Sequence, residues 1–166
     1  MNQAKKIDNS VLIPEMAALL HAGKDVRFTP TGVSMRPFIE GGSDIVVLRK
    51  KAAVAVGDIA LAVVQPAVSA VQHPAAQRPD NVYVLHRVIA VDGDSVTLAG
   101  DGNLGGTEHC RTQDVLGTVI RIENAKGRRK CLTRGRLWYY IRPCRKWLLK
   151  VYRKLLKFGL IGAEHR

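Results

Sequence analysis

Hydrophobic residues near the start of the chain recur every three to four positions. They are Val11, Leu12, Met16, Leu19 and Leu20. This spacing predicts an amphipathic helix over residues 10–22, capped by Asn9 or Ser10 and ended by Gly23. Pro14 fits such a helix only near its first turn, which supports a start near Ser10.

The middle of the chain shows short, β-branched stretches separated by turns that contain glycine. They predict strands over residues 25–29, 44–48, 58–64, 82–91, 95–99 and 114–122. The Asp-Gly-Asp sequence at residues 92–94 predicts a hairpin turn between two of these strands. Short strands joined in this way favour a coiled, mainly β core over alternating β-α-β units. Residues 65–80 are rich in Ala, Gln and Pro without a period, which predicts a long surface loop.

From Arg134 onward an apolar stripe returns, with basic residues in the gaps. Its members are Leu137, Trp138, Ile141, Cys144, Trp147, Leu148, Val151, Tyr152 and Leu155. The spacing predicts one amphipathic helix, or two helices that meet at Pro143. We therefore expect two parts. Residues 1–126 contain a β core over residues 25–122, and residues 127–166 form a basic amphipathic helical tail.

The charge is distributed unevenly between these parts. Residues 127–163 contain twelve basic and no acidic side chains, which leaves 14 basic residues against 14 acidic ones elsewhere. The apolar stripe has two ways to be buried. It packs on the β core, or it lies in a lipid interface with Lys and Arg toward the headgroups. The charge favours lipid, and Trp138 and Trp147 suit such an interface. The expected partner of the tail is an anionic membrane surface.

A basic tail with Trp and Tyr is also compatible with a nucleic-acid-binding protein, because cations neutralise phosphates. The aromatic residues, however, fall on the apolar stripe rather than among the charges. Nucleic acid is therefore the less expected partner.

Several features indicate a cytoplasmic location. The three cysteines are Cys110, Cys131 and Cys144. Their odd number and the lack of CxxC spacing indicate ordinary thiols in a reducing compartment. The first ten residues contain no apolar run typical of a secretory signal. Residues 59–77 are uncharged, but Pro66, Pro74 and several polar side chains argue against a transmembrane helix. We expect a cytoplasmic chain that touches membranes only peripherally.

Three residues are candidates for a hydrolytic site. Ser34 lies between Gly32 and Pro37, on a turn that would present its hydroxyl. That hydroxyl needs a base to become a nucleophile. His86 is the best candidate, since it alone among the five histidines lies inside an apolar strand, where its ring needs a partner. Asp101 follows the paired strand and could orient that ring. Taken singly, each residue also has an ordinary structural explanation in a turn or a core.

Four stretches of the chain together resemble one family. GVSMRPFI and GSDIVVL, within residues 32–48, resemble the nucleophile box of the signal peptidase I superfamily, which includes the LexA-like peptidases. GDIALAVV at residues 57–64 resembles the next box. VLHRVIAVDGDSVTLAGDGN at residues 84–103 resembles the base box with its hairpin, and DVLGTVI at residues 114–120 resembles the closing strand. The resemblance covers residues 27–122 and implies a small, coiled, barrel-like β core.

The resemblance implies a serine endopeptidase that cleaves a peptide bond by acyl transfer, without metal or cofactor. Ser34 would be the nucleophile and Asp101 the orienting acid. His86 would be the general base, as in the archaeal and endoplasmic-reticulum branch, where the other branches have lysine. Gly32, Ser34 and Met35 would shape the oxyanion and substrate-binding region, with the Ser34 N–H as the main donor. Family members often carry a hydroxyl residue at the position of Gly32; Thr31 is a conceivable substitute.

This sequence departs from the family in two further respects. The loop at residues 65–80 is longer than expected between these boxes, and we expect no membrane-spanning anchor. Processing of exported preproteins is therefore not implied. A catalytically silent, peptidase-like scaffold is the alternative function.

Overall fold

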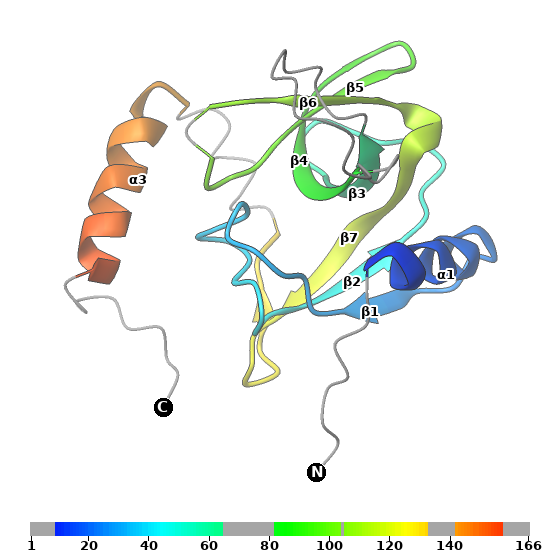
Figure 1. The fold of residues 1–166 in the computed structure, drawn as a ribbon, viewed down its shortest axis with the longest axis horizontal. Helices are drawn as coiled ribbons and strands as arrows, with labels where there is room; N and C mark the ends of the chain where they lie inside the picture. Colours follow the sequence, from blue (N-terminus) through cyan, green and yellow to red (C-terminus); the bar gives the residue numbers. More distant parts are fainter. Residues whose placement is uncertain (1–8, 65–81, 104, 133–141, 158–166) are drawn as a thin grey trace, which may run out of the picture.

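A computed structural model describes residues 9–64, 82–103, 105–132 and 142–157 (Figure 1). The loop expected at residues 65–80 lies outside the described residues. So does the start of the predicted tail helix, up to residue 141.

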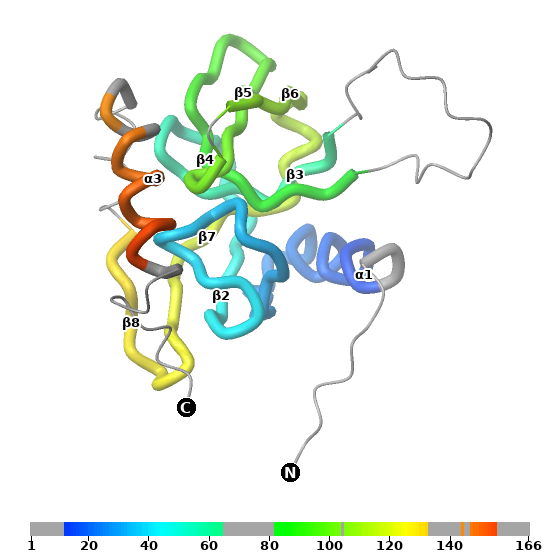
Figure 2. Tube along the Cα trace, turned by 60° about the vertical axis from the view of Figure 1, so that its left-hand side comes forward, coloured from blue at the N-terminus to red at the C-terminus, as the bar shows by residue number. Residues whose placement is uncertain are grey.

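Eight strands form one antiparallel sheet that curls around the core (Figures 1 and 2). They are β1 (Val26–Phe28), β2 (Ile45–Arg49), β3 (Ile59–Val64), β4 (Val82–Asp92), β5 (Ser95–Ala99), β6 (Glu108–Arg111), β7 (Val115–Glu123) and β8 (Arg129–Lys130). Their order is β1-β2-β7-β3-β4-β5-β6, and β8 pairs with β7. A 3-10 turn, Thr112–Asp114, precedes β7. The prediction of a mainly β protein with flanking helices is confirmed.

The six predicted strands correspond to β1 to β5 and β7, each to within one residue at either end. β6 and β8 were missed because they are short and polar. β6 has the sequence Glu-His-Cys-Arg, in which no residue is fully buried, and β8 consists of Arg129 and Lys130. Such strands form because a neighbouring strand offers its backbone, and side-chain pattern does not reveal that.

The helix α1 (Asn9–His21) confirms the predicted N-terminal helix and covers one part of the sheet. Its residues Ile13, Met16 and Leu20 are buried in a cluster with residues of β1, β2 and β7. A Cβ atom at Gly117 would lie 3.1 Å from Leu20 Cδ1, so a glycine in β7 allows α1 to approach closely. A second cluster joins β3, β4 and β5 through Ala60, Ala62, Val88, Val96 and Leu98.

The second described helix, α3 (Arg142–Lys157), stands at one side of the molecule (Figure 1). Leu149 on this helix is only 1% exposed, so the helix packs on the β body. The boundary expected between the two parts, at residue 127, lies in the turn between β7 and β8. These two strands pair with each other, with Ile122 opposite Lys130. The sheet therefore extends past that boundary to residue 130.

Candidate active site

The turn that carries Ser34 lies between β1 and β2. Its backbone is closed by hydrogen bonds from the Arg36 N–H to the Val33 carbonyl (3.2 Å) and from the Phe38 N–H to the Met35 carbonyl (3.0 Å). Gly32 has a φ of +95°, a conformation that favours glycine. Met35 and Ile39 are buried in the core and fix the turn from below. Ser34, between these anchors, is half-buried.

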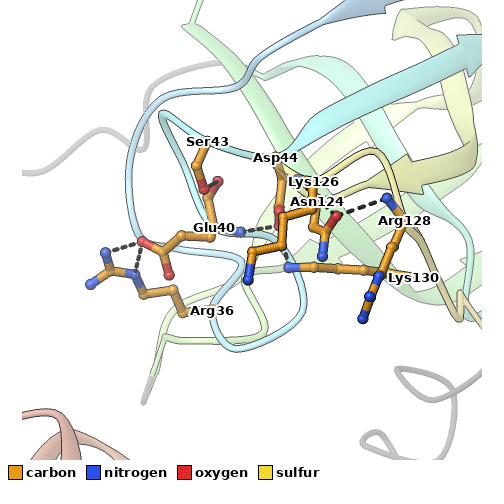
Figure 3. Close-up of polar contacts among 8 residues, drawn as sticks. All are labelled: Arg36, Glu40, Ser43, Asp44, Asn124, Lys126, Arg128 and Lys130. Atoms are coloured by element: carbon orange, nitrogen blue, oxygen red, sulfur yellow. Dashed lines mark hydrogen bonds and ion pairs between the residues drawn. The ribbon is translucent and has the colours of Figure 1, made fainter. Parts of the chain in front are cut away.

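The far end of this turn is fixed by a buried carboxylate (Figure 3). Asp44 Oδ2 accepts hydrogen bonds from the Glu40 N–H (2.6 Å) and from Lys130 Nζ (2.5 Å). The Arg36 guanidinium also binds the Glu40 carboxylate, with Nε 2.8 Å from Oε1. The turn is thus connected to β8 as well as to the core.

A cavity of about 150 Å³ opens between this turn and β4. Its walls are formed by Pro30, Thr31, Gly32, Ser34, Met35, Ile39, Gly41, Tyr83, Val84, Leu85 and His86. The structure therefore brings Ser34 and His86, from distant parts of the chain, to the same cavity. Gly32 and Met35, the other expected oxyanion and substrate-binding residues, also line it. Within the described residues, no hydrogen bond joins the Ser34 hydroxyl to the His86 ring.

The His86 ring is held by a carboxylate that the sequence did not single out. His86 Nδ1 lies 2.9 Å from Glu108 Oε2, and the two side chains are 7% and 29% exposed. Glu108 is paired with Leu98, which is paired with Val88, two residues from His86 along β4. Residues two apart on a strand share a face, so Glu108 and His86 lie on the same side of the sheet. With Nδ1 bonded to Glu108, Nε2 is the ring nitrogen left for a base.

The position of Asp101 differs from the expected one. Its carboxylate forms a buried ion pair with Arg87, with Arg87 Nη2 2.6 Å and Nε 2.9 Å from the two oxygens. The physical reason is strand alternation: His86 and Arg87 are neighbours, so their side chains point to opposite faces. Asp101 follows Ala99, the partner of Arg87, and lies on the Arg87 side. The carboxylate at His86 is that of Glu108.

The loop around Asp101 nevertheless supports the Ser34 turn. The Gly102 N–H donates to the Ser34 carbonyl at 2.7 Å. A Cβ atom at Gly102 would lie 2.9 Å from the carbonyl oxygens of Val33 and Arg36. Only glycine lets the two backbones approach this closely, so the Gly-Asp-Gly sequence serves as a packing surface for the turn.

Glu108 was missed because its position depends on the pairing of β6 with β5, two strands away from His86 in the sheet. The only local signal is a carboxylate at the start of a short polar strand, and such residues are common. Among the described residues, no three His, Cys, Asp or Glu side chains cluster as metal ligands would.

Comparison with known proteins adds no family assignment: no family model and no curated protein matches this sequence. What bears on function is therefore the geometry of the cavity and of the residues around it.

Proposed function

We propose that this protein is a serine endopeptidase of the signal-peptidase-like class, with Ser34 as nucleophile and His86 as general base. The observation that carries the proposal is their meeting at one cavity, with Glu108 bonded to the far nitrogen of the ring. A nucleophile, a base and a group that orients the base are the parts that serine hydrolysis requires.

Each side chain has a distinct role in the reaction. His86 Nε2 takes the Ser34 hydroxyl proton as Oγ attacks the peptide carbonyl carbon. Glu108 accepts the Nδ1–H of the ring, which fixes the tautomer and stabilises the imidazolium that forms. His86 then gives the proton to the leaving amine, and the peptide C–N bond breaks. A water molecule, deprotonated by His86, attacks the acyl carbon. The ester C–Oγ bond then breaks, His86 returns the proton to Ser34 Oγ, and the acid is released.

The developing oxyanion needs donors at the Ser34 end of the cavity. The Ser34 N–H is the main candidate. Thr31 also lines the cavity, which makes its hydroxyl available in place of the side-chain donor that Gly32 lacks.

The cavity suits a small side chain of the substrate. Met35, Ile39 and Leu85 supply apolar walls, Ser34 and His86 supply polar ones, and the volume of about 150 Å³ limits the size of the side chain. The ladder between β4 and β5 begins at Arg87, so among the described strands residues 82–86 have a partner only in β3. An extended peptide could pair with this edge and present its carbonyl to Ser34.

Labelling with a fluorophosphonate tests the proposal, because the reagent reacts with activated serines. The adduct in the wild-type protein is expected at Ser34, identified by mass spectrometry of peptides. His86→Ala should slow labelling by at least about a hundredfold, and Ser34→Ala should abolish it. Ser95→Ala, at an exposed serine on the β4–β5 hairpin, is the matched control and should label normally. A folded protein that is not labelled at Ser34 would instead be the silent scaffold.

A further inference from the structure

The helix α3 presents apolar side chains in two different directions. Leu149 is 1% exposed and Tyr152 is half-buried, and both face the β body. Trp147 is 65% exposed and Val151 is 36% exposed. Trp147 and Val151 are four residues apart and therefore adjacent on one helix face, well away from Leu149. The described part of the stripe is thus divided between an inner and an outer face.

The inner face lies against the Ser34 turn, and Figure 2 shows α3 beside the loop between β1 and β2. Leu149, Tyr152 and Arg153 line a small cavity together with Val33, Arg36 and Gly102. Arg153 Nη2 donates to the Gly102 carbonyl at 3.0 Å. Burial, together with the negative charge of Glu40, raises the pKa of Tyr152. This face already has a partner in the protein itself.

The outer face combines exposed apolar and cationic side chains. Lys150 and Lys154 are exposed, and their helical positions place them beside the strip formed by Trp147 and Val151. The sixteen residues of α3 include seven basic and no acidic ones. An exposed tryptophan bordered by lysines needs a partner with an apolar layer for the ring and an anionic layer for the ammonium groups.

We propose that the outer face of α3 docks this protein on an anionic lipid surface. Trp147 and Val151 enter the headgroup boundary, while Lys150 and Lys154 bind the lipid phosphates or carboxylates. None of the described helices is long and apolar enough to cross a membrane. Two inserted side chains and a few cations produce reversible, salt-sensitive attachment. Nucleic acid would bind Lys150 and Lys154 equally well, but it would leave Val151 without a role.

Binding to lipid through the outer face leaves the packing of α3 on the β body unchanged. The side chains that hold α3 on the body, Leu149, Tyr152 and Arg153, lie on or beside the inner face. The four side chains assigned to lipid are all exposed. Substitutions on the outer face should therefore leave the protein folded, which thermal unfolding of each variant checks.

Co-sedimentation with vesicles tests the proposal. Full-length protein should bind phosphatidylcholine vesicles containing about a third phosphatidylserine, release in high salt, and ignore pure phosphatidylcholine. The variant Trp147→Ser/Val151→Ser should bind at least about tenfold more weakly. Lys150→Glu/Lys154→Glu should lose about a hundredfold, since each cation becomes a repelled anion. The matched control, Lys24→Glu/Arg128→Glu, makes the same charge change at exposed sites elsewhere and should bind like the wild type.

The fluorescence of Trp147 provides an independent readout of insertion. In a Trp138→Phe protein, Trp147 is the only tryptophan, and its emission should shift to the blue with anionic vesicles. Ser34→Ala should bind vesicles normally, so docking and peptidase activity fail separately. If the α3 and control variants lost vesicle binding equally, net charge alone would explain the binding, and the proposal would be overturned. A second result would also overturn the proposal: duplex DNA binds through Lys150 and Lys154, and the Trp147→Ser/Val151→Ser variant still sediments with vesicles as the wild type does.

Discussion

Two neighbouring residues of β4 take part in different chemistry because their side chains leave the strand in opposite directions. His86 faces the cavity of Ser34 and pairs with Glu108. Arg87 faces the other way, pairs with Asp101, donates to the Gly57 carbonyl at 2.8 Å and lies over the Phe38 ring. One residue belongs to the candidate site, and the next one joins the segments around it.

This division makes Glu108 the positioning residue for His86. Glu108→Gln should slow fluorophosphonate labelling of Ser34 by about ten to a hundredfold, because the imidazolium loses its counter-charge. Glu108→Asp should recover part of the rate, and thermal unfolding should change little because the side chain is partly exposed.

An unchanged labelling rate in Glu108→Gln would mean that the bond to His86 is structural only. Glu15→Gln, at an exposed carboxylate on α1, is the control for a general loss of negative charge.

At the scale of elements, the loop between β5 and β6 and the turn between β1 and β2 are packed backbone against backbone. Gly102 lies at this contact, and its N–H binds the Ser34 carbonyl. Arg153 of α3 binds the Gly102 carbonyl from the other side. The position of Ser34 therefore depends on the loop around Gly102 and on α3, and neither of them carries a proposed catalytic group.

Gly102→Ala should disturb this contact. The added methyl group would lie 2.9 Å from two backbone carbonyl oxygens, which cannot rotate away, so the turn must shift. We expect a loss of about 1–3 kcal/mol of unfolding free energy in urea and at least about tenfold slower labelling of Ser34. Gly105→Ala is the control, because its added methyl group meets nothing within 4 Å. Equal behaviour of the two variants would contradict the role of Gly102.

At the scale of the whole molecule, the buried ion pair of Arg87 and Asp101 connects four segments. They are β4, the loop before β3, the Ser34 turn and the loop after β5. Both side chains are almost fully buried, and removal of one partner from such a pair leaves the other charge without its counter-charge in a low-dielectric interior.

Arg87→Met should therefore lower the free energy of unfolding by about 3–5 kcal/mol, measured by urea denaturation. Arg87→Met/Asp101→Leu should lose less than the single variant, because no charge remains buried without its partner. Arg49→Met, which breaks the exposed pair with Asp25, is the control and should cost less than about 1 kcal/mol. If the double variant lost as much unfolding free energy as its two single variants together, the two side chains would not be coupled.

The resemblance of four stretches implied Ser34 and His86 as partners, and both line one cavity. The local pattern of the sequence determined α1 and six strands to within one residue. Such features depend on spacing along the chain, which the side-chain period of each element makes visible. Only the tertiary structure decided which carboxylate reaches His86, since that depends on the register of β6, a strand without a hydrophobic signal. It also decided that α3 divides its apolar residues between two faces. Periodicity shows that a stripe is apolar, but what it contacts depends on parts of the chain far away in sequence.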